Sequence, residues 1–290
     1  MFKLKGWCEL GGNALKNTET RRYDRDEYFE LEFEVVAKLK AVFPRSRVEA
    51  VKAYRTKPSF GDMDVLVEVV DGDPLSGTNR YEVLEKTFTP NQMVKNGSVV
   101  SFDHKQFQVD VLFTPSDEFQ TSVDYFAWND LGNFVGRLSH KLGFKFGHDG
   151  LKFVMRDGTY QFKELVVSRD TRRTFEFLDL SYDRFQQGFD TMLDVFKFAS
   201  SSSFFNKNMF AEENRNHRSN VRDKKRKSYH DFVVWMNETP GLPEYPWEDM
   251  KEQGGPKYKE QYMQRAFEFF PEFEVTYKEA LLTNNKITLL

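Results

Sequence analysis

The sequence predicts an α+β protein whose small mixed sheet carries three aspartates. Two apolar, β-branched segments, 62–70 and 106–113, are typical of strands, and each contains aspartate. An amphipathic helical segment covers 24–43, and the chain beyond residue 181 is largely helical and charged. Strands gathered in one part of a chain and helices in another are typical of the α+β class.

The N-terminal part, residues 1–45, is expected to form an irregular segment and one helix. Residues 1–23 show no hydrophobic period and include Gly11-Gly12-Asn13. From 24 to 43, apolar residues recur at spacings of three and four, and Pro44 ends the helix. The recurring residues are Tyr28, Leu31, Val35, Leu39 and Val42.

The next part, residues 46–127, is expected to be a small mixed sheet with its helices on one side. Gly and Pro mark its turns, and alternation with β-branched residues marks its strands. The expected elements are a strand at 48–54, a polar turn at 55–61, a strand at 62–70, a helix at 79–88, and strands at 98–103 and 106–113.

The remaining chain divides into a mixed α/β subdomain at 128–180 and a helical extension at 181–290. Residues 116–143 have helical character, a strand pair is expected near 151–168, and a short helix at 170–178. In the extension, the pattern predicts one helix over about 182–199.

The two apolar strands place three carboxylates on the sheet. Side chains alternate between the faces of a strand, so Asp62 and Asp64 point to the same face. Asp110 lies between two valines in the second strand, and the three carboxylates converge if the two strands are neighbours. A lone Asp-x-Asp at a strand start is usually a turn cap, but carboxylates side by side are costly without a cation between them. The combination predicts a divalent metal site.

Magnesium is the expected metal, because it prefers oxygen ligands and keeps positions for phosphate and water. Two Mg²⁺ ions, for which Mn²⁺ can substitute, would support phosphoryl-type transfer by activating a hydroxyl and stabilising the leaving pyrophosphate. In this interpretation Asp62 and Asp64 bind both ions. Asp110 binds only the first and helps to take the hydroxyl proton.

The segment Ser59-Phe-Gly-Asp-Met-Asp-Val-Leu-Val67 closely resembles the metal-binding strand of the X family of DNA polymerases, which includes DNA polymerase beta. Asp110 with its flanking valines looks like that family's third catalytic aspartate. Segments 150–153 and 169–180 look like the strands and closing helix of the family's nucleotide-binding subdomain. The resemblance covers about residues 46–182, and it implies that 46–127 is the catalytic palm and 128–180 the nucleotide-binding subdomain. It implies attack of a 3′-hydroxyl on the α-phosphate of a nucleoside triphosphate, with release of pyrophosphate.

The same resemblance assigns a nucleotide pocket. The sequence from Tyr125 to Asp130, followed by Asn133 and Arg137, is similar to the family's nucleotide-binding helix. Asp130 would then lie over the incoming base, Asn133 would contact its minor-groove edge, and Arg137 would reach the template. Tyr125 and Phe126 weakly resemble the aromatic residues with which the family selects deoxyribose over ribose.

The phosphate-binding residues depart from the family pattern. The family has a Gly-Ser pair about ten residues before the glycine that corresponds to Gly61, and this chain has Val51-Lys52 there. Arg55 fits the family's phosphate-binding arginine, and Lys52 would supply charge in place of the serine hydroxyl. Gly61 is expected to contact the nucleotide together with these two residues. Gly11-Gly12 either approaches the phosphates or forms a plain turn. The family's N-terminal lyase and helix-hairpin-helix modules have no expected counterpart, so lyase activity is not implied.

A basic run in the last third of the chain predicts contact with nucleic acid. It holds seven cationic residues and one aspartate, and such residues displace condensed counterions from phosphates. A solvated helix face or a loop is the alternative. The predicted nucleic-acid-binding residues are Arg215, Arg218, Arg222, Lys224, Lys225, Arg226 and Lys227.

Composition is typical of a soluble globular protein, with 39% hydrophobic and 30% charged residues. The net charge of −3 argues against a dedicated nucleic-acid binder, although a carboxylate metal site lowers the total. Cys8 is the single cysteine, which excludes an intrachain disulfide. One cysteine and scattered histidines lack the ligand spacing of a zinc site, which argues against one. Without a signal peptide or membrane-spanning run, we expect a cytoplasmic monomer with no membrane partner, in the host cytoplasm if the chain is phage-encoded.

Four functions follow as hypotheses. The first is a template-directed DNA polymerase, favoured by Asn133 and Arg137, with a nucleoside triphosphate and a primer 3′ end as partners and DNA preferred over RNA. The second is an untemplated transferase acting on tRNA or another 3′ end. The third is a protein-nucleotidylating enzyme, which the basic run disfavours. The fourth is a non-catalytic binding module, which has no need for a repulsive cluster of carboxylates.

Overall fold

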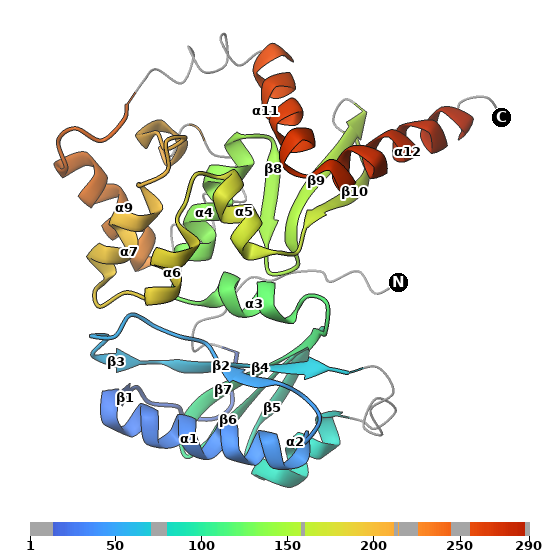
Figure 1. The fold of residues 1–290 in the computed structure, drawn as a ribbon. Helices are drawn as coiled ribbons and strands as arrows, with labels where there is room; N and C mark the ends of the chain where they lie inside the picture. The colour runs from blue at the N-terminus through green and yellow to red at the C-terminus, as the bar shows by residue number, and fades with distance from the viewer. Residues whose placement is uncertain are drawn as a thin grey trace. The chain divides into compact units, whose positions relative to one another are not determined.

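A computed structural model of the chain forms two compact units, Met1–Ala127 and Trp128–Leu290. Each unit contains helices and strands, which confirms the α+β class (Figure 1). The structure describes residues 14–70, 80–157, 160–211, 214, 226–244 and 256–287.

The first unit is built on a five-stranded mixed sheet with the strand order β2-β4-β7-β6-β5. The two long central strands, β4 and β7, run parallel, and the other neighbouring pairs are antiparallel. The strands are β2 (Val48–Ala50), β4 (Asp62–Val69), β5 (Met93–Asn96), β6 (Val99–His104) and β7 (Phe107–Pro115). A separate pair joins β1 (Tyr23–Asp24) to β3 (Ser59–Phe60), directly before β4.

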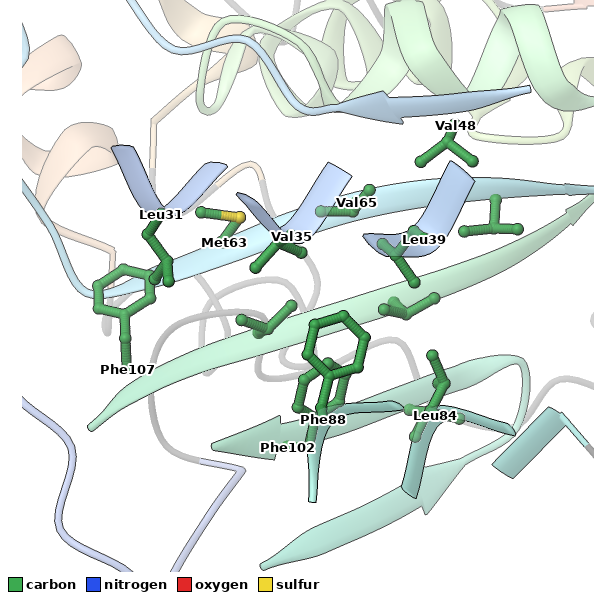
Figure 2. Close-up of a cluster of buried hydrophobic side chains, with 14 of the residues drawn as sticks. Leu31, Val35, Leu39, Val48, Met63, Val65, Leu84, Phe88, Phe102 and Phe107 are labelled. Carbon is green, nitrogen blue, oxygen red and sulfur yellow. The ribbon is translucent and has the colours of Figure 1, made fainter. Parts of the chain in front are cut away.

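One face of this sheet is covered by α1 (Arg25–Val42) and α2 (Arg80–Phe88), which enclose the main core (Figure 2). Asp24 begins α1 with a capping box, because its carboxylate accepts from the Glu27 backbone and the Glu27 carboxylate accepts from the Asp24 backbone. The buried residues of α1 are those that the periodicity predicts, Tyr28, Leu31, Val35 and Leu39.

The opposite face is partly covered by α3 (Phe119–Phe126), so the expectation that helices lie on one side of the sheet is wrong. Leu66 of β4 and Leu112 of β7 are apolar residues of this face. They require cover, and Phe119 and Val123 of α3 provide it. The cover extends over the C-terminal halves of the two central strands, whereas the predicted aspartates lie at their N-terminal halves and centre.

Two further predictions for this unit differ from the structure. The strand expected at 48–54 ends at Ala50, after which the Val51 N–H still donates to the Asp64 carbonyl at 2.9 Å. The short edge strand β5 was not predicted, because its Lys95 and Asn96 are exposed and give it little apolar character.

The second unit contains an antiparallel sheet of β8 (Phe144–Gly147), β9 (Gly150–Asp157) and β10 (Tyr160–Ser168), in the order β10-β9-β8. Its helices include α4 (Leu131–Lys141), α5 (Thr171–Phe177), α6 (Tyr182–Gln187), α7 (Met192–Ala199), the 3-10 helix η1 (Lys207–Met209), α9 (Lys227–Glu238), α11 (Pro256–Phe269) and α12 (Pro271–Ile287). Its core is rich in phenylalanine, including the fully buried Phe134, Phe205, Phe210 and Phe232.

Two stretches that were each predicted as continuous helix are divided into two helices in the structure. The stretch 116–143 is split between α3 and α4, and Trp128 and Asn129 between them have positive φ values of 64° and 63°. The stretch 182–199 is split at Gly188, whose φ of 76° ends α6 before Thr191 caps α7. Among the helices of the described residues, none combines the length and apolarity that crossing a membrane requires.

Candidate active site

The pairing of β4 with β7 brings the predicted aspartates onto neighbouring strands. The parallel register sets Asp64 beside Asp110, and Asp62 beside Gln108. Because side chains alternate along a strand, these four residues share one face. Met63 and Val65 of β4 point into the core on the other face. The condition that the sequence left open, that the two strands be neighbours, is met in this fold.

Burial makes this group of carboxylates energetically unfavourable. Asp110 is only 1% exposed. Burial is the main cause that raises the pKa of Asp110 to about 6, and the negative charge of Asp62 adds to it. Burial, followed by the charges of Asp62 and Asp110, raises the pKa of Asp64 well above its ordinary value. Among the described residues, no group donates a hydrogen bond to the buried Asp64 Oδ1.

Two neutral side chains hold Asp110. Gln108 Nε2 donates to Asp110 Oδ1 and to Oδ2, at 3.0 Å in each case. Ser101, directly opposite Asp110 on β6, also forms a hydrogen bond with the carboxylate, and both contacts lower its pKa. Sequence reasoning missed both residues. Alternation along the strand was a sufficient signal for Gln108, which lies two residues before Asp110. Ser101 can be identified only once the register between β6 and β7 is known.

Positive charge reaches the site from the loop between β2 and β3. The charge of Lys57 lowers the pKa of Asp64, against the larger effects that raise it. The predicted phosphate-binding residues Lys52 and Arg55 are exposed residues of the same loop. The loop begins beside Asp64, through the hydrogen bond of the Val51 N–H to the Asp64 carbonyl. Lys57 was treated only as part of a polar turn, so its role was missed.

A second cation lies at Gly61. A Cβ atom added to Gly61 would lie 3.0 Å from Arg22 Nη1. The Arg22 guanidinium is held there because its Nη2 donates to the carbonyl and hydroxyl oxygens of Ser59, both at 3.0 Å. Gly61, predicted to contact the nucleotide, comes directly before Asp62. Because it has no side chain, it leaves room for the exposed Arg22. No sequence signal distinguished Arg22 from other N-terminal cations.

The donor set fits Mg²⁺ or Mn²⁺, since it consists of three hard carboxylate groups with one oxygen lacking a donor. Within the part of the chain that the structure describes, no three Asp, Glu, His or Cys side chains are yet grouped closely enough to hold an ion. The carboxyl groups of Asp62, Asp64 and Asp110 are nevertheless near enough to perturb one another electrostatically. Binding would require these groups to close around the cation.

The residues that resemble a nucleotide-binding helix are distributed over the two units. Tyr125 and Phe126 end α3 in the first unit, where their rings meet edge to face at 5.3 Å. In the second unit, Asn133 Nδ2 donates to Asp130 Oδ1 at 2.9 Å. Arg137, on the same helix as Asn133, is buried with 8% exposure.

Asp130 is also engaged by the start of α9. The Arg226 guanidinium forms an ion pair with the Asp130 carboxylate, and the Ser228 hydroxyl donates to it. Lys227 forms an exposed ion pair with Asp231, at 2.6 Å. The two described members of the predicted basic run therefore have acidic partners within the chain. The other predicted members, Arg215, Arg218, Arg222, Lys224 and Lys225, lie outside the described residues, as do Cys8 and Gly11-Gly12.

Comparison with known proteins gave no assignment: no family model and no curated protein sequence matches the chain. Function is therefore inferred from the site itself. Its chemistry is that of neighbouring buried carboxylates, one with an unsatisfied oxygen, beside a loop and a strand start that carry cations.

Proposed function

We propose that the chain is a divalent-metal-dependent nucleotidyltransferase. In this proposal it adds nucleotides from a nucleoside triphosphate to a nucleic-acid 3′-hydroxyl, as an X-family-like DNA polymerase. The observation that carries the proposal is the register of β4 and β7, which puts Asp64 beside Asp110, with Asp62 on the same face.

The energetics of this arrangement support a cation-binding role. A buried acceptor without a donor costs about 1–3 kcal/mol, and more when it is charged. Among the described residues, Asp64 Oδ1 is such an acceptor, and two further carboxylates repel it. A chain that used these residues only for structure would gain stability from neutral replacements. The arrangement is therefore better explained by a ligand of positive charge.

The surrounding residues suit a nucleoside triphosphate. Bound Mg²⁺ would supply charge neutralisation for the phosphates and activation of the hydroxyl. Lys57 provides positive charge near Asp64, and Arg22 provides it at Gly61, directly before Asp62. Lys52 and Arg55 are exposed residues of the same loop as Lys57, and the family resemblance assigns them to the triphosphate. Of the three aspartates, Asp110 is the proposed acceptor of the hydroxyl proton.

The test is a labelled-nucleotide assay with Mg²⁺ or Mn²⁺, with dNTPs or NTPs, and with either a primed template or single-stranded ends. We expect template-dependent extension. The Asp110→Asn variant should lose transfer and keep nucleotide binding. Asp183→Asn is the matched control, since Asp183 is an exposed carboxylate paired with Arg172 outside the site.

The acceptor is decided by the same experiment. Extension without a template would favour a terminal transferase, and label on the protein itself would favour protein nucleotidylation. No turnover with either metal, or equal turnover by wild type and Asp110→Asn, would refute the proposal.

A further inference from the structure

We propose that Gln108 is a positioning residue that orients the Asp110 carboxylate for cation binding, and that the backbone of Ala14 fixes the direction of the Gln108 amide. This inference rests on the proposed function, because it concerns the same site. It adds a residue of the N-terminal segment to that site.

Gln108 is placed between two groups of opposite hydrogen-bonding character. Its side chain is fully buried, on the face of the sheet that carries Asp62 and Asp110. Its Nε2 donates to both oxygens of Asp110. Its Oε1 accepts the backbone N–H of Ala14 at 3.2 Å. The amide therefore has partners on both its donor and its acceptor side.

These partners determine which way the amide points. The oxygen and nitrogen of a glutamine amide have nearly the same shape, so the hydrogen-bond network decides their positions. The Ala14 N–H can only donate, and an ionised Asp110 can only accept. If the Gln108 amide were reversed, its NH₂ group would face the Ala14 N–H, donor against donor. Its oxygen would face the Asp110 carboxylate, acceptor against acceptor. The Ala14 contact thus keeps the NH₂ group turned toward the carboxylate.

A neutral donor suits a ligand that must bind a cation. One NH₂ group that bridges Oδ1 and Oδ2 restricts the rotation of the Asp110 carboxylate. Each carboxylate oxygen has two lone-pair sites, so acceptor capacity remains for an ion. A lysine or arginine at position 108 would also neutralise Asp110, whereas glutamine leaves its negative charge available. Groups of this kind around metal ligands commonly contribute to metal affinity.

The chain offers a matched control in Gln92. Its Oε1 accepts the backbone N–H of Asn17 at 2.8 Å, which is the same kind of anchor to the N-terminal segment. The backbone N–H of Gln92 donates to Asp103, and no bond from its side chain to the three candidate ligands occurs within the described residues. Loss of the Gln92 side chain therefore tests anchoring of the segment without disturbing Asp110.

The experiment measures Mn²⁺ affinity by electron paramagnetic resonance of the free ion, together with thermal unfolding of the metal-free proteins. Gln108→Met removes both hydrogen-bonding groups with little change in shape, and should weaken Mn²⁺ binding by about 10- to 100-fold. Gln92→Met should leave the affinity unchanged. Ala14→Pro removes the N–H donor and should weaken binding in the same direction, whereas Ala14→Ser keeps the N–H and should bind as wild type does.

The outcomes separate this inference from the proposed function. Wild-type protein that binds no Mn²⁺ would overturn the proposed function and this inference with it. Wild-type protein that binds Mn²⁺, with equal affinity in a folded Gln108→Met variant, would overturn the positioning role alone. If Gln108→Met does not fold, Ala14→Pro serves as the test, because it leaves every side chain of the site in place. Wild-type affinity in that variant would then overturn the role of the amide direction.

Discussion

Replacing Asp110 by asparagine should stabilise the metal-free protein at neutral pH, although it should abolish activity. The pKa of Asp110 is raised from 3.8 to about 6, mainly by burial. A shift of one pKa unit corresponds to about 1.4 kcal/mol, so keeping Asp110 ionised at pH 7 costs the folded state about 3 kcal/mol. Asparagine removes this charge but leaves Gln108 one acceptor oxygen instead of two, a loss of about 1 kcal/mol. The expected net gain is about 2 kcal/mol.

The sign of the pH dependence follows from the raised pKa. Between the ordinary pKa of 3.8 and the folded-state pKa of about 6, the folded protein binds more protons at Asp110 than the unfolded chain does. The contribution of Asp110 to stability is therefore most favourable below this window and is lost as the pH rises through it. The advantage of Asp110→Asn over wild type should be full at pH 7 and should shrink toward pH 4.

Urea denaturation in the presence of a chelator, at pH 7 and near pH 4, measures this difference directly. Addition of Mg²⁺ should then stabilise the wild type, by mass action, and leave Asp110→Asn nearly unaffected. Asp183→Asn, which changes an exposed carboxylate, should respond to Mg²⁺ as the wild type does. A lower stability of Asp110→Asn than of wild type at pH 7 without metal, or an equal gain of both from Mg²⁺, would show that the Asp110 charge is not destabilising or does not bind the ion.

Three further predictions concern residues around and outside the site. Gly61→Ala should change the free energy of unfolding in urea by less than about 1 kcal/mol, because the added methyl group meets only the end of the long, exposed Arg22 side chain, which can shift despite its hydrogen bonds to Ser59. A larger loss would show that these hydrogen bonds fix the guanidinium in place. Phe232→Ala should cost about 3–5 kcal/mol in the same measurement, since the ring is fully buried among other aromatic rings, and a loss below about 1 kcal/mol would contradict the described core. The Glu34 carboxylate should titrate in NMR with a pKa of about 2, lowered chiefly by its hydrogen bond to Lys105. Its small, largely screened contribution to stability should be present above pH 4.5 and be lost as the pH falls toward 2. An ordinary pKa for Glu34 would show that the contact with Lys105 does not persist in solution.

The elements with strong periodicity were predictable from the sequence. The buried stripe of α1 and the strands β4 and β7 follow directly from hydrophobic patterns along the chain. The strand β5 and the break at Gly188 were not predicted, because the first is short and half exposed and the second lies within a sequence of helical composition. The second face of the sheet was misjudged because Leu66 and Leu112 look like part of one continuous apolar run.

The candidate site was predictable to the extent that it depends on neighbours along the chain. Asp62 and Asp64 share a face by alternation, and Gln108 shares a face with Asp110 for the same reason. The contacts of Ser101 and Arg22 depend on which strands pair and in which register, and a single sequence does not specify that pairing. These are the contacts that hold Asp110 and bring positive charge to Gly61.

The carboxyl groups at positions 62, 64 and 110 should jointly bind a divalent cation. The most direct test is a crystal grown with Mn²⁺, in which anomalous scattering locates the ion. We expect an anomalous peak within coordination distance of Asp62, Asp64 and Asp110, and no such peak in crystals of Asp64→Asn. Manganese bound only elsewhere, with these carboxylates neutralised by Arg22 or Lys57, would contradict it.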